Sequence, residues 1–482
     1  MPLQRLDSLS EIAPQVWDAL VPKAQPFVRH AFLSALEDSA SLGPHSGWQP
    51  EHLLHWEGDR LVAALPGYRK WHSSGEYVFD HGWADACQRA DIDYYPKLLV
   101  AVPFSPVSGP RLLAASAEDG FELLNSLPGY LEIEGLSSAH INFTDPLADD
   151  ALAQQPGWLQ RLGCQFHWQN RGYRDFQDFL DALSSRKRKQ MRKEREQVAG
   201  QGIEFEWLQG HELSEAQWDF VYACYANTYA VRRQAPYLTR AFFSLLAERM
   251  PEAIRVVLAK QGTRPVAMAF SLIGGDSFYG RYWGCLAEFD RLHFETCFYQ
   301  GMDYAIAHGL QRFDAGAQGE HKLIRGFEPV ITRSWHYLRH PGLKNAVEDF
   351  LARERVGILA YAEEARAALP YRQGCTRFAS GRLLLAQPSI GHAADHRAKD
   401  RREPEHPQLL DRPPAHDQRR PRTAGRVDRG VGHGNRDQVD QRQGQADGDG
   451  REALRGTWVG GAEDDQHEHR CHHQLTDEPR GQ

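Results

Sequence analysis

Alternating apolar and polar positions predict a first group of short strands near the start of the chain. Residues 51–56 and 61–68 alternate in this way on either side of a polar, glycine-containing turn, which predicts a hairpin. Residues 76–79 predict a third strand. Residues 94–102 are apolar but contain Pro96, so the pattern leaves their conformation open.

The same theme returns more clearly later in the chain. Residues 254–260, 265–273 and 277–283 predict three consecutive strands joined by tight turns. Residues 294–309 carry apolar side chains at helical spacing, and residues 310–315 predict another strand. The order strand, strand, strand, helix, strand indicates a mixed sheet with a βαβ crossover. The predicted fold class is therefore α/β with an α+β mixed sheet.

A basic helix is predicted between the two groups. Asp175 is a suitable N-cap for a helix, and seven of the eleven residues 186–196 are Lys or Arg. This run is a candidate surface for tRNA phosphates, an acyl carrier or an anionic membrane. The candidate contacts are Arg186, Lys187, Arg188, Lys189, Arg192 and Lys193. The alternative is an ordinary solvated helix face, diluted by Glu194 and Glu196.

Composition and charge narrow the class of protein. The chain has 482 residues, 41% of them apolar, and a net charge of −8, so any nucleic-acid surface must be local. The seven cysteines are odd in number and form no CxxC pair, which fits reduced thiols in the cytoplasm. The start has no apolar signal region, and no run approaches a membrane span. We therefore expect a cytoplasmic protein.

The last part of the chain differs from the rest. Residues 391–482 contain one aromatic residue, one Lys and nine His, so they lack the apolar surface to offset the entropy of ordering. We expect residues 386–482 to be disordered. The nonfunctional explanation is out-of-frame translation of GC-rich DNA, and the functional ones are an interaction arm or a metal site. That metal site would use His467, His469, Cys471, His472 and His473.

Long motifs in the chain resemble a known family. The segment YGRYWGCLAEFDRLHFETCFYQGMDYAIAHGLQRFDAGAQGEHKLIRGFEP is similar to predicted N-acyltransferases related to the Fem-type peptidoglycan aminoacyl ligases, within the GNAT-like superfamily. GEYVFDHGWADA, YYPKLLVAVPFSPVSGPRLL and SSRKRKQMRKERE also match, so the resemblance covers about residues 1–375. It implies transfer of an acyl or aminoacyl group to an amine acceptor, with a role in cell-envelope metabolism.

The resemblance also implies two tandem GNAT-like domains. The N-terminal domain would span residues 1–170, a basic helical connector 171–202, and a C-terminal domain with the active site 203–380. Neither a tightly bound cofactor nor a metal is expected in these domains. Acyl-CoA and aminoacyl-tRNA are the two candidate donor substrates.

One loop departs from the GNAT pattern. GNAT acetyltransferases bind the coenzyme A pyrophosphate with a glycine-containing loop and a helix N-terminus. Residues 285–292 occupy the corresponding place here, contain no glycine and include two acidic residues. The resemblance implies that Fem-type ligases share this lack and use aminoacyl-tRNA. The donor therefore stays open at this point.

The loop after the last predicted strand holds the densest group of candidate side chains. Acyl transfer needs a proton acceptor, a polarised carbonyl and fixed positions. Glu320 and His321 are candidate bases here, and His293 and Glu295 open the helix that faces the same strand ends. The candidate substrate-binding residues are Arg281, Tyr282, Trp283, Gln318, Gly319, Lys322 and Arg325.

Each of these groups also has a plain structural explanation. The loop fits a glycine turn with solvated charges, Glu295 fits a helix-dipole interaction, and Arg281 with its neighbours fits cross-strand packing. In the first region, residues 81–85 and 94–97 belong to the family pattern and predict either an acceptor pocket or structural aromatics. The alternative to an enzyme is a non-catalytic RNA- or anionic-surface-binding protein on a transferase scaffold.

Overall fold

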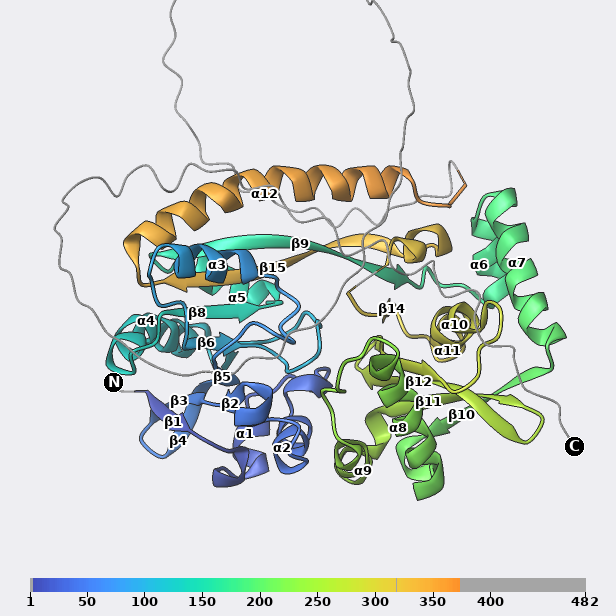
Figure 1. Cartoon of the computed structure of the whole chain (residues 1–482), viewed down its shortest axis with the longest axis horizontal. Coiled ribbons are helices and arrows are strands. Elements are labelled where there is room, and N and C mark those ends of the chain that lie inside the picture. The colour runs from blue at the N-terminus through green and yellow to red at the C-terminus, as the bar shows by residue number, and fades with distance from the viewer. Residues whose placement is uncertain (1–2, 318, 373–482) are drawn as a thin grey trace, which may run out of the picture. The chain divides into compact units, whose positions relative to one another are not determined.

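The computed structural model describes residues 3–317 and 319–372 (Figure 1). Its main feature is a mixed sheet of eleven strands in the order β10-β11-β12-β13-β14-β9-β15-β8-β6-β5-β2. In that order the strands are Ile203–Gln209, Ile254–Gln261, Arg264–Gly274, Ser277–Cys285, Arg312–Asp314, Trp158–Gln169, Glu328–Leu338, Ser138–Asn142, Lys97–Val100, Gly67–Lys70 and Trp48–Pro50. The prediction of an α/β fold with a mixed sheet is confirmed.

A smaller antiparallel sheet of four strands stands beside it. Its order is β1-β3-β4-β7, with the strands Gln4–Leu6, His52–Glu57, Arg60–Leu65 and Leu113–Ala114. The predicted strand 61–68 is therefore two strands in two sheets, β4 and β5. Gly67 makes the step possible, because a Cβ there would lie 2.4 Å from the carbonyl oxygen of Glu51.

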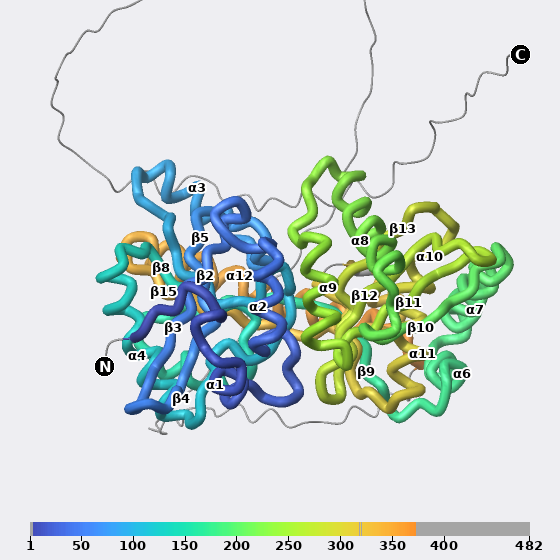
Figure 2. The backbone as a smooth tube through the Cα atoms, turned by 90° about the horizontal axis from the view of Figure 1, so that it is seen from below, coloured from blue at the N-terminus to red at the C-terminus, as the bar shows by residue number. Residues whose placement is uncertain are grey.

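The two halves of the large sheet repeat one connection. In the first half, β6 runs parallel to β8 and is connected to it through α4, Ala117–Ile133. In the second half, β13 runs parallel to β14 after the helical segment Leu292–Ala307. That segment consists of α10 (Leu292–Phe294), a π-helical turn (Glu295–Tyr299) and α11 (Gln300–Ala307). Figure 2 shows the first half in blue beside the second in green.

Strands β9 and β15 tie the halves together. β9 pairs with β14 of the second half, and β15 pairs with β8 of the first half. The two strands also pair with each other over ten positions, Trp158–His167 with Glu328–Tyr337. The sheet is thus continuous across residue 170, and the division into domains stays a prediction.

The remaining helices cover the sheets. They are α1 (Pro14–Asp18), α2 (His30–Asp38), α3 (His81–Arg89), α5 (Pro146–Ala153), α6 (Phe176–Ala182), α7 (Ser185–Gly200), α8 (Glu215–Ala230), α9 (Arg240–Arg249) and α12 (Pro341–Ala367). Asp175 caps α6 as expected, and Ser214 begins α8 with a capping box. In the part of the chain that the structure describes, no helix is long and apolar enough to cross a membrane.

The predicted strand at residues 76–79 is wrong. This segment is a loop in which Tyr77 has a φ of 57° and the Glu76 carboxylate lies 2.9 Å from the buried Lys97 ammonium. A buried ion pair thus accompanies the loop conformation, and an alternating pattern cannot reveal such a pair. The expectations for residues 386–482, including the metal site, lie outside the described residues.

Candidate active site

Strands β13 and β14 separate soon after they meet. Their parallel pairing covers only Ser277–Tyr279 with Arg312–Asp314, after which β13 continues to Cys285. The separation leaves the end of β13 without a neighbouring strand on that side. Ligands of α/β folds commonly bind at such carboxyl ends.

Helix α8 packs against this exposed end of β13. The hydroxyl of Thr228 donates to the carbonyl oxygen of Trp283 at 2.8 Å, and the amide of Asn227 donates to that of Cys285 at 2.8 Å. Gly284 permits the approach, because a Cβ there would lie 2.0 Å from the carbonyl oxygen of Cys224. Sequence reasoning missed both α8 residues, which lie in an otherwise ordinary amphipathic helix.

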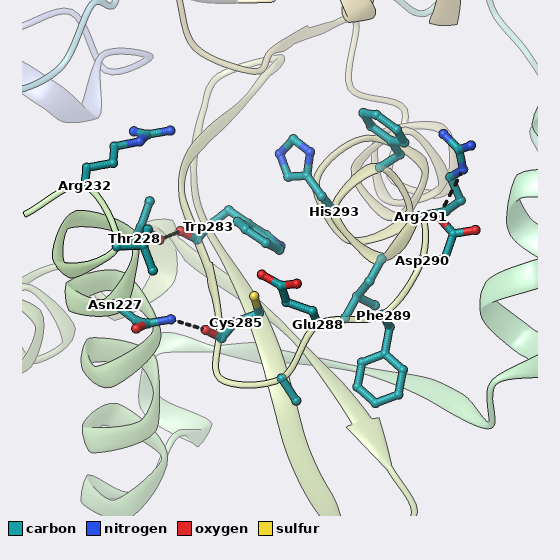
Figure 3. A pocket seen from close by; sticks show the side chains of 14 residues that line it. Asn227, Thr228, Arg232, Trp283, Cys285, Glu288, Phe289, Asp290, Arg291 and His293 are labelled. Atoms are coloured by element: carbon teal, nitrogen blue, oxygen red, sulfur yellow. Dashed lines mark hydrogen bonds and ion pairs between the residues drawn. The ribbon is translucent and has the colours of Figure 1, made fainter. Parts of the chain in front are cut away.

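A cavity of about 380 Å³ opens between α8, the end of β13 and α10 (Figure 3). The side chains of Trp283, Glu288 and His293 extend into it. The glycine-free loop after β13 forms part of the wall, as its place in the sequence suggested. Burial and the nearby Glu288 raise the pKa of the Cys285 thiol, which makes it a poor nucleophile at neutral pH.

A neutral imidazole, His293, lines this cavity, and a second, His321, lies next to it. The ring of His293 is 4.8 Å from Trp283 and 6.0 Å from His321, measured between ring centroids. Burial, His321 and the cations Arg325 and Lys322 lower the pKa of His293 to about 3. Burial and the same two cations lower the pKa of His321 to about 4. Both rings are therefore uncharged at neutral pH, and the site as it stands disfavours their protonated forms.

Lys322, which follows His321 directly in the chain, is a buried cation. It is 3% exposed, and its ammonium donates to the carbonyl oxygen of Gly316 at 2.7 Å. Burial lowers the pKa of Lys322 to about 8, with Asp314 opposing this effect and Arg281 adding to it. The side chain is thus mainly an ammonium at pH 7, although it is held in a site that disfavours charge.

Arg281 occupies a β-bulge at the point where the strands separate. Phe270 pairs with Tyr282 and Ser271 with Gly280, which leaves Arg281 as the extra residue. Its guanidinium lies 2.9 Å from the Asp314 carboxylate, and both side chains are 2% exposed. Its Nε atom is buried without a hydrogen-bond partner.

Asp314 connects the bulge to the loop after β14. Burial would raise the pKa of Asp314, but Arg281 and His167 outweigh it and hold the pKa below its usual range. Its carboxylate also accepts the backbone N–H of Gly316 at 2.8 Å, and His167 lies 3.8 Å away. Neither Asp314 nor His167 was a candidate from the sequence. A carboxylate at a strand end was the one available signal for Asp314.

Two predicted site residues face α7 instead of the cavity. Arg325 donates to Glu194 at 2.9 Å, and the Glu295 carboxylate accepts from Arg195 at 2.9 Å. Burial raises the pKa of Glu295, although Arg195 counteracts it. Both residues were expected at the site because they open the crossover helix, but a π-helical turn begins at Glu295.

The other predicted residues are divided between core and loop. Tyr282 packs into an aromatic core, 5.1 Å from Tyr225, while Trp283 lines the cavity. Gly319 has a φ of 112°, and a Cβ there would lie 2.2 Å from the ring of His321, so only glycine fits. Gln318 and the side chain of Glu320 lie outside the described residues.

Two of the cations on the basic helix are held by neighbouring side chains. Arg188 lies 3.1 Å from Asp181, and Arg192 donates to Gln177 at 3.0 Å. Arg186, Lys189 and Lys193 recur at helical spacing and are exposed, so they form one cationic outer face. Lys187 is half-buried.

The first half contains a second, more open hollow of about 540 Å³. Its lining includes His81, Asp85, Tyr94 and Tyr95, which belong to the predicted acceptor segments. Lys97 is fully buried behind it, 2.5 Å from Asp80. Within residues 3–317 and 319–372, no group of three or more His, Cys, Asp or Glu is arranged to hold a metal.

Comparisons with solved structures show limited likeness. A crystal structure of FemX is 12% identical, covers 72% of this chain and 100% of its own, and has a TM-score of 0.45. A C-terminal domain of a putative lysylphosphatidylglycerol synthetase from Agrobacterium fabrum is 10% identical, covers 71% of this chain and 96% of its own, and has a TM-score of 0.44. A tandem GNAT protein from the clavulanic acid biosynthesis pathway is 10% identical, covers 70% of this chain and 99% of its own, and has a TM-score of 0.37.

These likenesses are too weak to carry a conclusion about function, and no curated protein matches the chain significantly. The family comparison is decisive by contrast, because one model matches residues 8–373, which is well over half of the chain. That model is described as peptidoglycan biosynthesis/recognition. The resemblance to Fem-type proteins is confirmed: the chain belongs to the FemAB-like family.

Proposed function

We propose that this protein is an N-acyltransferase that moves an acyl or aminoacyl group onto an amine in cell-envelope metabolism. Family membership supports a transferase of the cell envelope. The observation that carries the proposal is the position of His293, a neutral imidazole in the cavity wall, 6.0 Å from the ring of His321, which directly precedes the buried Lys322.

The reaction needs one bond to form and one to break. The acceptor nitrogen attacks the donor carbonyl carbon, and the bond from that carbon to the leaving oxygen or sulfur breaks. The proton that the amine loses passes to the leaving atom. In our proposal His293 takes up this proton only in passing as the C–N bond forms, because its ring is uncharged and lines the cavity. The low pKa of this imidazole makes its protonated form a strong acid, which gives the proton to the leaving atom at once.

Lys322 supplies the positive charge. An oxyanion develops on the carbonyl oxygen during attack, and a preorganised donor in a dry site stabilises it strongly. The burial of Lys322 and its single backbone acceptor, Gly316, leave two of its three N–H groups for such a role. Arg281 and Asp314 then act behind Lys322 by setting its charge, whereas the sequence placed Arg281 in contact with substrate.

The loop after β13 favours an aminoacyl donor over acyl-CoA. Glu288 and Asp290 line the cavity from this loop, which has no glycine for close contact with a diphosphate. Phosphates would meet like charge there. An aminoacyl-tRNA would instead place its phosphates on the outer face of α7, formed by Arg186, Lys189 and Lys193. Such a donor implies action on the cytoplasmic side of the membrane.

The test is a transfer assay with matched variants. Purified protein is incubated with radiolabelled aminoacyl-tRNA pools or acetyl-CoA and with amine-containing cell-envelope precursors, and products are identified by mass spectrometry. His293→Ala and Lys322→Met should abolish product, whereas the exposed His308→Ala and Lys23→Ala should not. A salt-sensitive RNA complex without turnover on any donor would favour the binding-only alternative.

A further inference from the structure

Helix α7 has an inner face as well as its basic outer face. Met191, Glu194 and Val198 recur at helical spacing and are all buried, with Glu194 4% exposed. In the sequence Glu194 only dilutes a run of positive charge. In the structure it is a buried carboxylate, which requires partners to offset the loss of water.

Glu194 finds those partners in the second half of the molecule. One of its oxygens accepts from Arg325 at 2.9 Å and also from the hydroxyl of Tyr299. The other oxygen accepts from Gln190 at 3.1 Å. Burial would raise the pKa of Glu194, but the Tyr299 and Arg325 contacts outweigh it and lower the pKa.

Arg325 in turn fixes the turn that carries the proposed catalytic groups. Residues Glu320–Arg325 form a short 3₁₀ helix, and Arg325 donates to the carbonyl oxygen of His321 at 2.9 Å. The guanidinium also stacks on the ring of Phe294 at 3.5 Å. Lys322 is held at the other side of the turn by Gly316.

Such a turn needs outside support. Short 3₁₀ segments have poor hydrogen-bond geometry, and Gly319 precedes this one in a conformation that costs backbone entropy. Lys322 at one side and Arg325 at the other make the polar side-chain contacts that hold this turn, while His321 and Leu323 pack against the aromatic core beside it. Of these, the Arg325 contact ends on α7.

We propose that Glu194 is a positioning residue, which holds His321 and Lys322 in place through Arg325. Its catalytic consequence rests on the proposed function. The structural part of the proposal does not depend on that function, because it concerns only how firmly residues 320–327 are held. The same helix thus presents cations outward and anchors the catalytic turn inward.

The experiment compares Glu194→Gln with Glu196→Gln. Glu196 lies two residues further on the same helix and is exposed, so both variants remove one negative charge from the basic run. Hydrogen exchange is followed for residues 320–327, where the N–H groups of Lys322, Gly326 and Phe327 are hydrogen-bonded within the turn. Acetylation of Lys322 by a water-soluble acylating reagent is measured by mass spectrometry against pH.

We expect Glu194→Gln to speed exchange in residues 320–327 by at least about tenfold, with no change in the β11–β12 hairpin. The pH midpoint of Lys322 labelling should move from about 8 toward that of an ordinary lysine as water enters. Glu196→Gln should match the wild type. Unchanged exchange in Glu194→Gln, or equal acceleration throughout the protein, would overturn the proposal.

Two further measurements separate positioning from general stability. If Glu194→Gln does not fold, Tyr299→Phe and Arg325→Lys should loosen the same turn to a smaller degree, and no loosening in either would overturn the proposal. Where turnover is detected, Glu194→Gln should lower kcat with little change in donor KM. If the turn loosens in Glu194→Gln but the wild type shows no turnover on any donor, the proposed function is refuted. The positioning of the turn by Glu194 would still be supported.

Discussion

Arg281 and Asp314 form a buried ion pair across the point where β13 and β14 separate, with 2.9 Å between guanidinium and carboxylate. The pair lies beside Lys322 and acts on its charge from two sides, since Asp314 raises and Arg281 lowers its pKa. The same two residues therefore lie where the strands separate and influence the charge of the proposed catalytic lysine.

This pair gives a prediction about pH dependence. Asp314→Asn removes the charge that raises the pKa of Lys322, so that pKa should fall below about 8. Because the proposed role needs the ammonium, the alkaline limb of the pH–rate profile should move to lower pH. Arg281→Met should move it to higher pH. Equal shifts in the same direction would contradict this account.

The same substitutions should affect stability. Leaving one member of a buried ion pair without its partner costs about 3–5 kcal/mol, whereas replacing both costs far less. We therefore expect Asp314→Asn to lower the free energy of unfolding more than the double variant Arg281→Met/Asp314→Asn does. Urea unfolding measures the difference. An additive loss in the double variant would refute the coupling.

The half-buried His293 and His321 and the buried His140 should make the protein sensitive to acid. His293 and His321 have pKa values of about 3 and 4 in the folded protein, and His140, which is 1% exposed, has one of about 3. In the unfolded chain these values rise to about 6.5, so the unfolded state binds more protons. Stability is then complete above pH 6.5 and declines toward pH 4.

Thermal unfolding at pH 7.5 and pH 5 tests this sign. The melting temperature should fall at pH 5, and His140→Asn should reduce the fall, although it lowers stability at pH 7.5 by removing a buried contact. The exposed His308→Asn should leave the pH dependence as it is. A melting temperature that rises on acidification would contradict the assigned charges.

Close packing of α8 on β13 gives a steric prediction. A Cβ at Gly284 would lie 2.0 Å from the backbone of α8, so Gly284→Ala should cost about 1–3 kcal/mol and disturb the cavity wall. Gly129 in α4 has no atom within 4 Å of such a Cβ, so Gly129→Ala should be neutral or slightly stabilising. Equal effects at both positions would argue against tight packing.

The outer face of α7 should determine the salt dependence of RNA binding. Replacing Arg186, Lys189 and Lys193 together by Gln should weaken tRNA binding and lower the slope of log K against log salt by about 2–3. Arg195→Gln serves as the comparison, because its guanidinium already pairs with Glu295 and Asp303. A slope that does not change in the triple variant would exclude this face as the contact.

The sequence was most informative where one property decides the structure. Alternation identified β11, β12 and β13 nearly to their ends. The roles of His293 and Lys322, which were chosen as polar residues near the predicted strand ends, stay predictions. The sequence was least informative where a partner far away in the chain decides which way a side chain faces. Glu295 and Arg325 are polar residues at the predicted site, but they pair with two charges on α7, the partly exposed Arg195 and the buried Glu194, instead of facing the cavity.

The failure at residues 76–79 has the same cause. Glu76 is alternating in pattern but pairs with Lys97, which lies in a strand more than twenty residues later. Local propensity cannot anticipate an ion pair of this kind, and burial makes its energetic effect large. Glu194 was overlooked for the same reason, since a charge run reveals nothing about which of its members is buried.

Photocrosslinking of the donor tests the central claim most directly. An aminoacyl-tRNA analogue with a photoreactive group on the aminoacyl moiety is irradiated with the protein, and the labelled peptide is identified by mass spectrometry. We predict labelling at the cavity between Trp283 and His293, and loss of that label in Trp283→Ala. Labelling confined to the hollow around Tyr94 and Tyr95 would show that the acyl group binds in the first half of the sheet.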